Sequence, residues 1–147
     1  MSQFLQFFNT MGPAQFSQAA CQMAPYFSSI DPLMQELQPN HAVASVKFRK
    51  EITNHLGTIH AIALCNAAEF VGGIMTDVSV PAGTRWIPKG MTVEYLAKAK
   101  SDIKAIADGT GIDWATAGDK IVPVEIFDAE GKKVFTASIT MNLKPAA

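Results

Sequence analysis

Residues 58–76, TIHAIALCNAAEFVGGIMT, form a long apolar stretch that decides the fold. Thr58 is a residue type that begins helices well, and a helix of about 18 residues spans about 27 Å. Because this helix is apolar almost all round, other elements must cover every side of it, and a curved sheet wrapped around it would do so. The stretch also has nearly the length of a membrane span, but the acid Glu69 within it favours a core helix.

The segments on either side of this helix show the two-residue period of β-strands. Residues 41–48 alternate between two faces, as do residues 91–100, and residues 103–107 form a shorter partner. The carboxyl end reads as a hairpin, with arms at 121–127 and 132–143 joined by the turn DAEG. The sequence therefore predicts an α+β fold in which an antiparallel sheet wraps around one long central helix.

Residues 2–37 read as a series of helices that pack beside this unit. Pro25 and Pro32 break the segment, which opens with an apolar stripe at helical spacing formed by Phe4, Leu5, Phe8 and Met11. A helix that lies on a membrane surface would carry Lys or Arg on its polar face, and this segment has none. We therefore expect a single domain over 1–147, with a helical segment at 1–38 and the sheet and central helix at 41–144.

The composition narrows the class of protein. Only 17% of the 147 residues are charged and the formal net charge is −1, so the chain lacks the basic surface that binds nucleic acid. The two cysteines, Cys21 and Cys65, have neither metal-ligand nor disulfide spacing and are expected to be reduced, buried thiols. Asp31 is the first charged residue, so the signal-peptide pattern is missing and a cytoplasmic protein is expected.

The run NHLGTIH at residues 54–60 leads into the central helix and could bind a carbonyl group. Gly57 is expected where the linker enters the helix, so its backbone N–H would belong to the unpaired groups at the positive end of the helix. A carbonyl oxygen placed there would be polarised, as in an oxyanion hole. Glu69 is about 18 Å farther along the helix axis, too far to act on the same small group within one chain. If both residues serve one site, two subunits must share it.

The other polar residues near the helix start have competing interpretations. Glu69 could instead satisfy a backbone donor or pair with a lysine. The helix dipole disfavours a protonated His60, so a neutral hydrogen-bonding role is preferred to general-base catalysis. His55 could contact a substrate or be an ordinary solvated loop residue. Asn66 precedes Glu69 by one turn on nearly the same face and could orient its carboxylate.

Two stretches of the chain resemble a known family. The run NHLGTIHAIALCNAAE at residues 54–69 resembles the signature of hotdog-fold thioesterases of the phenylacetate-pathway type, and especially a related uncharacterised branch with N-H-x-G-T-x-H-A followed by an acid. Asn54 and His60 keep the family's spacings of fifteen and nine residues before the acid Glu69. The hairpin VEIFDAEGKKVFTASITM resembles the closing strands of the family around a D-x-x-G-K turn. Together the resemblance covers residues 41–144.

The resemblance implies a hotdog fold and a homodimer, often assembled into a homotetramer, that hydrolyses an acyl-CoA without metal or cofactor. The thioester carbonyl would meet the Gly57 N–H of one subunit, and Glu69 of the other would act as nucleophile or as base for water. Asn54 would help to place the carbonyl or the water. The remaining residues expected to contact substrate are His55, Thr58, His60 and Asn66.

The chain also departs from the family pattern. It has His60-Ala61-Ile62 where the phenylacetate-type enzymes have His-Gly-Gly, and its acid is Glu rather than Asp. These departures leave the substrate preference open. A non-catalytic acyl-thioester binder is a second interpretation, and a hotdog dehydratase or hydratase is a weaker third because no Phe-Pro-Gly segment occurs. The candidates for binding the phosphates of coenzyme A, each equally an ordinary surface residue, are Arg85, Lys89, Lys98 and Lys100. The phenylalanines that could line an acyl pocket, although such stripes are more typical of core, are Phe4, Phe7, Phe8 and Phe16.

Overall fold

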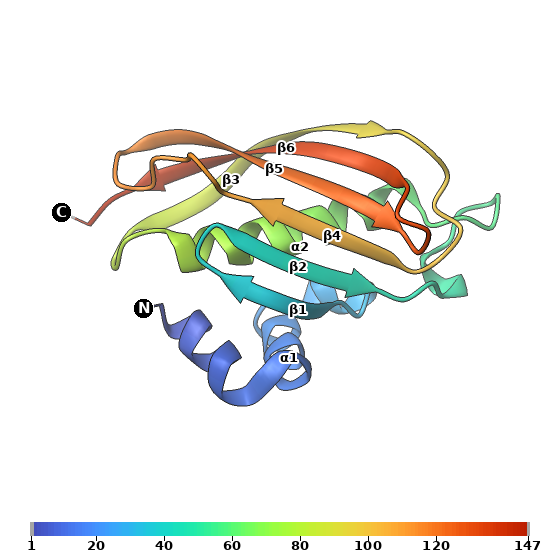
Figure 1. Ribbon diagram of the computed structural model, residues 1–147, viewed down its shortest axis with the longest axis horizontal. Helices are drawn as coiled ribbons and strands as arrows, with labels where there is room; N and C mark the ends of the chain where they lie inside the picture. The colour runs from blue at the N-terminus through green and yellow to red at the C-terminus, as the bar shows by residue number, and fades with distance from the viewer. Residues whose placement is uncertain (1, 147) are drawn as a thin grey trace.

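Six antiparallel strands form one sheet, and a long central helix, α2, lies along one face of it (Figure 1). The computed structural model describes residues 2–146. In chain order its elements are α1 (Gln3–Met23), η1 (Pro25–Ser29), β1 (Leu33–Gln38), β2 (His41–Val46), η2 (Lys50–Ile52), α2 (Ala61–Ser79), β3 (Arg85–Tyr95), β4 (Ile103–Asp108), β5 (Gly118–Asp128) and β6 (Lys133–Lys144). The strand order is β1-β2-β4-β5-β6-β3, which leaves β1 and β3 at the two edges. The predicted α+β architecture is confirmed.

The central helix is a core helix, as predicted. Of the 18-residue apolar stretch within this helix, 67% is buried, although the length and hydropathy of the helix alone would let it cross a membrane. Glycine allows it to approach the sheet closely, because a Cβ on Gly72 would lie only 2.9 Å from Cδ1 of Ile139 on β6. The predicted start at residue 58 is three residues too early. Ile59 still forms a bridge with Thr53, so the helix begins only at Ala61.

The carboxyl-terminal hairpin also agrees with the sequence. Strands β5 and β6 pair along their length, and the turn is closed by the Asp128 side chain, which accepts hydrogen bonds from the N–H groups of Glu130 and Lys132. The side chains of β6 that were predicted to face the core are all buried, namely Phe135, Ala137, Ile139, Met141 and Leu143. The predicted strand at 103–107 is present as β4, between β2 and β5.

Strand β3 differs from its prediction at both ends. It begins at Arg85 rather than residue 91, since an edge strand tolerates Pro88 and the bulge that follows it. It ends at Tyr95 because the regular pairing stops there: the N–H groups of Leu96 and Ala97 both donate to the Val134 carbonyl of β6. Farther on, the Ala99 carbonyl accepts a hydrogen bond from the N–H of Ile59. The end of β3 is thereby tied to the segment that leads into α2.

The largest error of the sequence prediction lies at residues 33–38, which form strand β1 and not a helix. A bulge between Met34 and Glu36 brings Met34 and Leu37 to the same buried face of the sheet. These apolar residues are therefore three apart, the spacing that also marks a helix. The helical segment ends at Ser29, so the boundary predicted at residue 38 is wrong and β1 belongs to the sheet.

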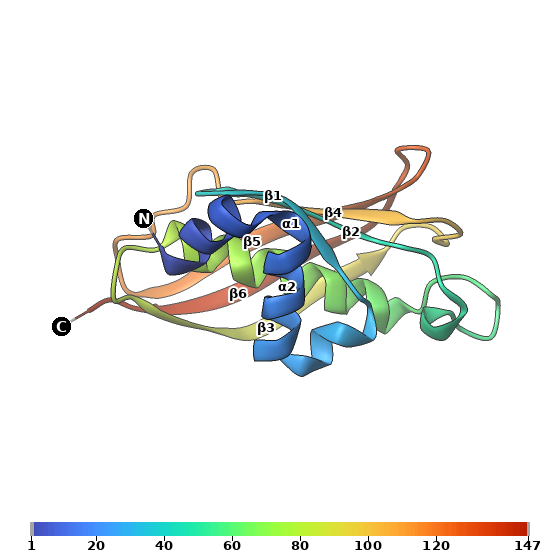
Figure 2. The ribbon, with the colours of Figure 1, turned by 90° about the horizontal axis from the view of Figure 1, so that it is seen from below.

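Helix α1 is bent and packs against both β1 and α2. Gly12 has a φ of 83° and Pro13 follows it, so the axis turns sharply there. Ser17 connects α1 to the sheet edge, since its hydroxyl accepts a hydrogen bond from the N–H of Met34 (2.8 Å). Beyond the bend, α1 crosses α2 and ends beside β3 (Figure 2). Both cysteines are free, as predicted, but they are half-buried rather than buried.

Candidate functional site

The turn before α2 is closed by Asn54. Its Oδ1 accepts hydrogen bonds from the N–H groups of Leu56 (2.9 Å) and Thr58 (3.2 Å), and its own N–H donates to the Thr58 carbonyl (2.8 Å). Gly57 allows this turn through a φ of 77°, and its N–H donates to the Asn54 carbonyl (3.0 Å). The predicted position of Gly57 at the helix terminus is therefore wrong. Gly57 lies four residues before α2, and its N–H is already bonded within the turn.

The first residue of α2, Ala61, takes the position that the sequence analysis gave to Gly57. His60 caps the helix, because its Nδ1 accepts a hydrogen bond from the N–H of Ile62 (3.0 Å). Within residues 2–146 the Ala61 N–H has no hydrogen-bond acceptor. It is therefore free at the positive end of the helix dipole. The signal for it was in the sequence, since Ala61 stands where the phenylacetate-type enzymes have the first glycine of His-Gly-Gly.

A cavity of about 330 Å³ is lined by Ala61. It brings together two predicted site residues, Asn54 and Thr58, and it is also lined by Leu64, Tyr95, Leu96 and Lys98. Thr58 is buried, and its hydroxyl bonds the Asn54 amide (3.1 Å). Both side chains are thus engaged with each other, which stiffens the turn that borders the helix start.

The other predicted site residues lie elsewhere around the helix start. His60 lines a second cavity of about 380 Å³ on the opposite flank, together with Asn66. The Nδ2 of Asn66 donates to the Ser29 hydroxyl (3.1 Å), so Asn66 holds η1 against α2 and does not orient Glu69. His55 is exposed in the turn. The Nδ1 of His60 accepts a hydrogen bond from the Ile62 N–H, so this side chain is used to cap α2.

Glu69 is exposed in this chain, although the sequence analysis expected other elements to cover every side of the helix. It lies eight residues after Ala61, or about 12 Å along the helix axis. Within residues 2–146 its carboxylate forms no ion pair. It lines an apolar cavity of about 340 Å³ between α1, α2 and β3, and also a smaller one of about 270 Å³ bordered by Lys89, Gly90 and Met91. Glu69 therefore lines two cavities, both of which are also lined by residues of β3.

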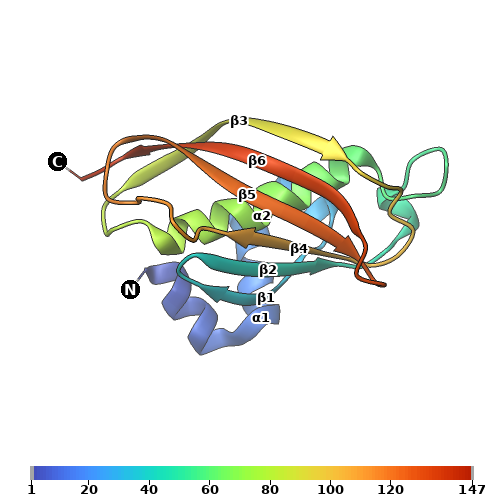
Figure 3. The same ribbon diagram turned by 45° about the horizontal axis from the view of Figure 1, so that its top comes forward.

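The second half of β3 is left uncovered beside Glu69. Met91 and Tyr95 pair with Ile139 and Phe135, so they point to the core face of the sheet. Their partners are fully buried, yet Met91 is 38% exposed and Tyr95 is 52% exposed. Strand β3 forms one edge of the sheet (Figure 3), and its first half packs against α2 through Trp86. An apolar core face next to a carboxylate is thus open at this edge.

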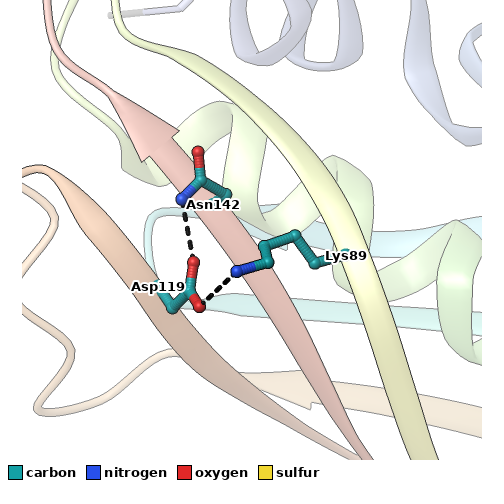
Figure 4. A network of polar contacts seen from close by, with 3 residues as sticks. All are labelled: Lys89, Asp119 and Asn142. Atoms are coloured by element: carbon teal, nitrogen blue, oxygen red, sulfur yellow. Dashed lines mark hydrogen bonds and ion pairs between the residues drawn. The ribbon is translucent and has the colours of Figure 1, made fainter.

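The opposite face of β3 carries a polar network formed with β5 and β6. Lys89 Nζ contacts Asp119 Oδ2 (2.8 Å), and Asn142 Nδ2 donates to Asp119 Oδ1 (2.8 Å), as Figure 4 shows. These two hydrogen bonds, that of Lys89 first, hold the pKa of Asp119 below its usual range. Because Lys89 is paired, it is a poorer candidate for a phosphate than Lys98, which lines the cavity at Ala61 and forms no ion pair with the described residues.

No metal centre is found in the part of the chain that the structure describes. Among residues 2–146, no three side chains of His, Cys, Asp or Glu gather closely enough to hold a metal ion. The groups available for chemistry at this edge are therefore the Ala61 N–H, the Glu69 carboxylate and the apolar cavities beside them.

Comparisons with known proteins agree with this architecture. The family described as a domain of unknown function, DUF4442, matches residues 12–143. A crystal structure described as genomics APC5556 is 54% identical, with a TM-score of 0.90 over 98% of this chain and 97% of that chain. No curated protein matches the sequence.

More distant structures share the fold. Thioesterase HI1161 from Haemophilus influenzae is 13% identical, with a TM-score of 0.72 over 82% of both chains. A thioesterase family protein from Silicibacter pomeroyi is 11% identical, with a TM-score of 0.75 over 88% of this chain and 96% of that chain. These likenesses confirm the hotdog fold that the sequence resemblance implied.

Proposed function

The chain belongs to the DUF4442 family and has the hotdog fold, and we propose that it hydrolyses an acyl-CoA thioester in a site shared by two copies of the chain. One observation carries this proposal. The free Ala61 N–H and the Glu69 carboxylate lie on the same helix, about 12 Å apart along its axis, and each lines its own cavity. Each cavity thus holds one half of a hydrolytic site.

The open face of β3 supports the sharing of the site. Met91 and Tyr95 would lose their exposed apolar surface if a second copy packed against them, which is favourable by about 25 cal/mol per Å². An uncovered edge strand also has unpaired backbone groups that can extend a sheet into a second chain. Two copies related by a twofold axis at β3 would each present Glu69 to the other. The expected assembly is a homodimer, or a dimer of such dimers.

The chemistry follows from the two half-sites. The thioester carbonyl oxygen would accept a hydrogen bond from the Ala61 N–H, which stabilises the oxyanion as it develops. Glu69 of the second copy would take a proton from water as the water oxygen bonds to the carbonyl carbon. The C–S bond then breaks, the proton passes to the sulfur of coenzyme A, and the free acid leaves. Alternatively, Glu69 would attack the carbonyl carbon itself, the C–S bond would break to release coenzyme A as its thiolate, and water would then cleave the resulting anhydride to the free acid and the Glu69 carboxylate.

A non-catalytic acyl-thioester binder is the second candidate, and one observation favours it. Glu69 is exposed in a single chain, so its presence costs the fold little and is not by itself a sign of catalysis. The binder and the hydrolase differ in a single measurable property, the release of free thiol.

The test is a thiol-release assay over short, medium, long and aromatic acyl-CoA substrates, run on the wild type and on Glu69→Gln. We expect turnover by the wild type and a fall in kcat of about 10²–10⁴-fold in the variant, with the dimer still folded. Glu94→Gln, a change of the same kind on the outward face of β3, should keep its activity. Full activity in Glu69→Gln would refute the mechanism, and binding without turnover across the panel would favour the binder.

A further inference from the structure

The apolar cavity of about 340 Å³ beside Glu69 is built from four elements, α1, η1, α2 and β3. Helix α1 supplies Phe4, Ala20 and Met23, and the short helix η1 supplies Phe27. Helix α2 and the start of β3 complete it with Phe70 and Trp86, among others. Glu69 is the one ionisable side chain among the lining residues, all of which lie within the described chain.

The wall on the β3 side is rigid. The indole Nε1 of Trp86 donates a hydrogen bond to Oδ1 of Asp77 (2.9 Å), which fixes the ring. A Cβ on Gly73 would lie 3.1 Å from the ring atom Cη2, so the glycine leaves room for the indole to pack closely against α2. On the next face of α2, Phe70 is held by an edge contact with Phe27 (5.2 Å between centroids). The cavity is thus preformed, as binding pockets usually are.

The wall on the α1 side depends on the bend at Gly12. The bend brings Phe4, from the first half of the helix, to the same cavity as Ala20 and Met23, from the second half. Of the four phenylalanines that the sequence singled out, only Phe4 reaches the cavity. Phe16 is buried beneath it and contacts the Phe4 ring edge-on (6.1 Å between centroids). Helix α1 therefore forms one wall of the cavity, in addition to covering the β1 edge of the sheet.

We propose that this cavity holds the acyl chain of the substrate and that α1 sets which chains fit. The inference rests on the proposed function, because the acyl carbon to be attacked must lie at Glu69, and Glu69 is at the rim of the cavity. An acyl chain attached to that carbon can extend directly into the space between α1, α2 and β3. The N-terminal helix is then a specificity element of the enzyme.

The size and polarity of the cavity define the substrate class. Pockets for small molecules measure roughly 300–1,000 Å³, and this one is at the small end of that range. Apart from Glu69, its lining side chains offer little to bond a hydroxyl or carboxylate on the chain, and burying such a group unpaired is unfavourable. The preferred substrates are therefore unsubstituted acyl groups of medium length, such as octanoyl, rather than acetyl or dicarboxylic acyl groups.

Ala20→Phe tests this inference by filling the cavity from α1. We expect kcat/KM for octanoyl-CoA to fall tenfold or more relative to acetyl-CoA. Octanedioyl-CoA, which has the same length but ends in a carboxylate, should be turned over by the wild type at least tenfold less well than octanoyl-CoA. The matched control is Ala14→Phe, on the same helix but outside this cavity, which should keep the wild-type profile. Met23→Trp is a second variant that cannot damage the core, because Met23 is 68% exposed at the cavity.

A binding measurement separates this inference from the proposed function. Calorimetry with octanoyl-CoA and acetyl-CoA on the Glu69→Gln variant, with and without Ala20→Phe, measures how tightly the cavity binds each acyl chain in the absence of turnover. If the wild type releases no thiol but Ala20→Phe weakens octanoyl-CoA binding selectively, the acyl cavity stands and the hydrolase fails. If octanoyl-CoA is hydrolysed and neither Ala20→Phe nor Met23→Trp alters the chain-length profile, the cavity inference is overturned. A change in dimer affinity alone would overturn it too, since the occupant would be a second copy.

Discussion

The two edge strands of the sheet, β1 and β3, differ in how far the rest of the chain covers their core-facing residues. On β1 the core-facing residues Met34 and Leu37 are buried, and α1 is tied to the strand through the hydrogen bond to Ser17. On β3 the core-facing residues Met91 and Tyr95 keep 38% and 52% of their surface exposed. The chain thus covers one edge with its own N-terminal helix and leaves half of the other edge uncovered. The Glu69 carboxylate lies at the uncovered edge, so the incomplete side of the fold is also the side on which we propose the hydrolytic site.

Met91→Asp is expected to have the largest effect, because it places a charge in the middle of the open face. The dimer dissociation constant should rise about 100-fold or more, equal to roughly 2.7 kcal/mol, and hydrolysis should disappear with the dimer. Light scattering and the thiol-release assay measure the two effects. Thr92→Asp adds the same charge on the outward face and should change neither. An active, stable monomer would contradict the shared site.

Met34→Ala tests the covered edge. Removal of this buried side chain should lower the free energy of unfolding by about 2–5 kcal/mol, measured by urea denaturation. The oligomeric state should not change, since β1 is closed by the chain itself. Met11→Ala, at an exposed position of α1, is the control and should stay within about 0.5 kcal/mol of the wild type. Dissociation of the dimer by Met34→Ala would show that β1 also contributes to the interface.

Ala61→Pro removes the free N–H at the open edge without breaking the helix. Proline is favoured at the first helical position, and His60 has a ψ of 139°, which suits a residue before proline. We expect kcat to fall about 10²–10³-fold with little change in thermal stability. Gly57→Ala is the matched comparison, because it forces a residue with a Cβ into a positive φ but leaves the Ala61 N–H unchanged. It should cost about 1–3 kcal/mol of stability without removing the donor. Activity lost in Gly57→Ala and retained in Ala61→Pro would reverse our assignment.

Lys89→Ala should have the smallest effect and compares the two faces of β3. Loss of the Lys89 hydrogen bond should raise the pKa of Asp119 toward its usual value. A carboxyl whose pKa is lower in the folded than in the unfolded protein stabilises the fold at pH values above its unfolded pKa, and this contribution is lost as the pH falls through its folded pKa. The free energy of unfolding of the variant should therefore differ from that of the wild type mainly above the unfolded pKa of Asp119. The effect on stability is small because the pair is on the surface. NMR titration of the Asp119 carboxyl measures the shift, and a changed dimer affinity would place this face in the interface.

The sequence predicted the elements whose signals are local. The hairpin of β5 and β6 follows from strict alternation and an Asp-to-Gly turn, and the central helix from a long apolar run. Strand β1 was missed because its bulge spaces Met34 and Leu37 like neighbours on a helix. Gly57 was misplaced for a related reason, since a glycine before a helix looks the same whether its N–H is free or bonded within a turn. In each case the deciding contact lies outside the local pattern.

By itself the sequence determined the fold class, the central helix with the acid Glu69 in its middle, and the resemblance to hotdog thioesterases. Periodicity and turn chemistry are properties of neighbouring residues, so they can be read along the chain. Only the tertiary structure decided that Ala61 presents the free N–H, that Glu69 is exposed at an uncovered edge, and that α1 closes a cavity beside it. Exposure and cavities depend on which distant elements lie across a face, and that arrangement exists only once the whole chain has packed.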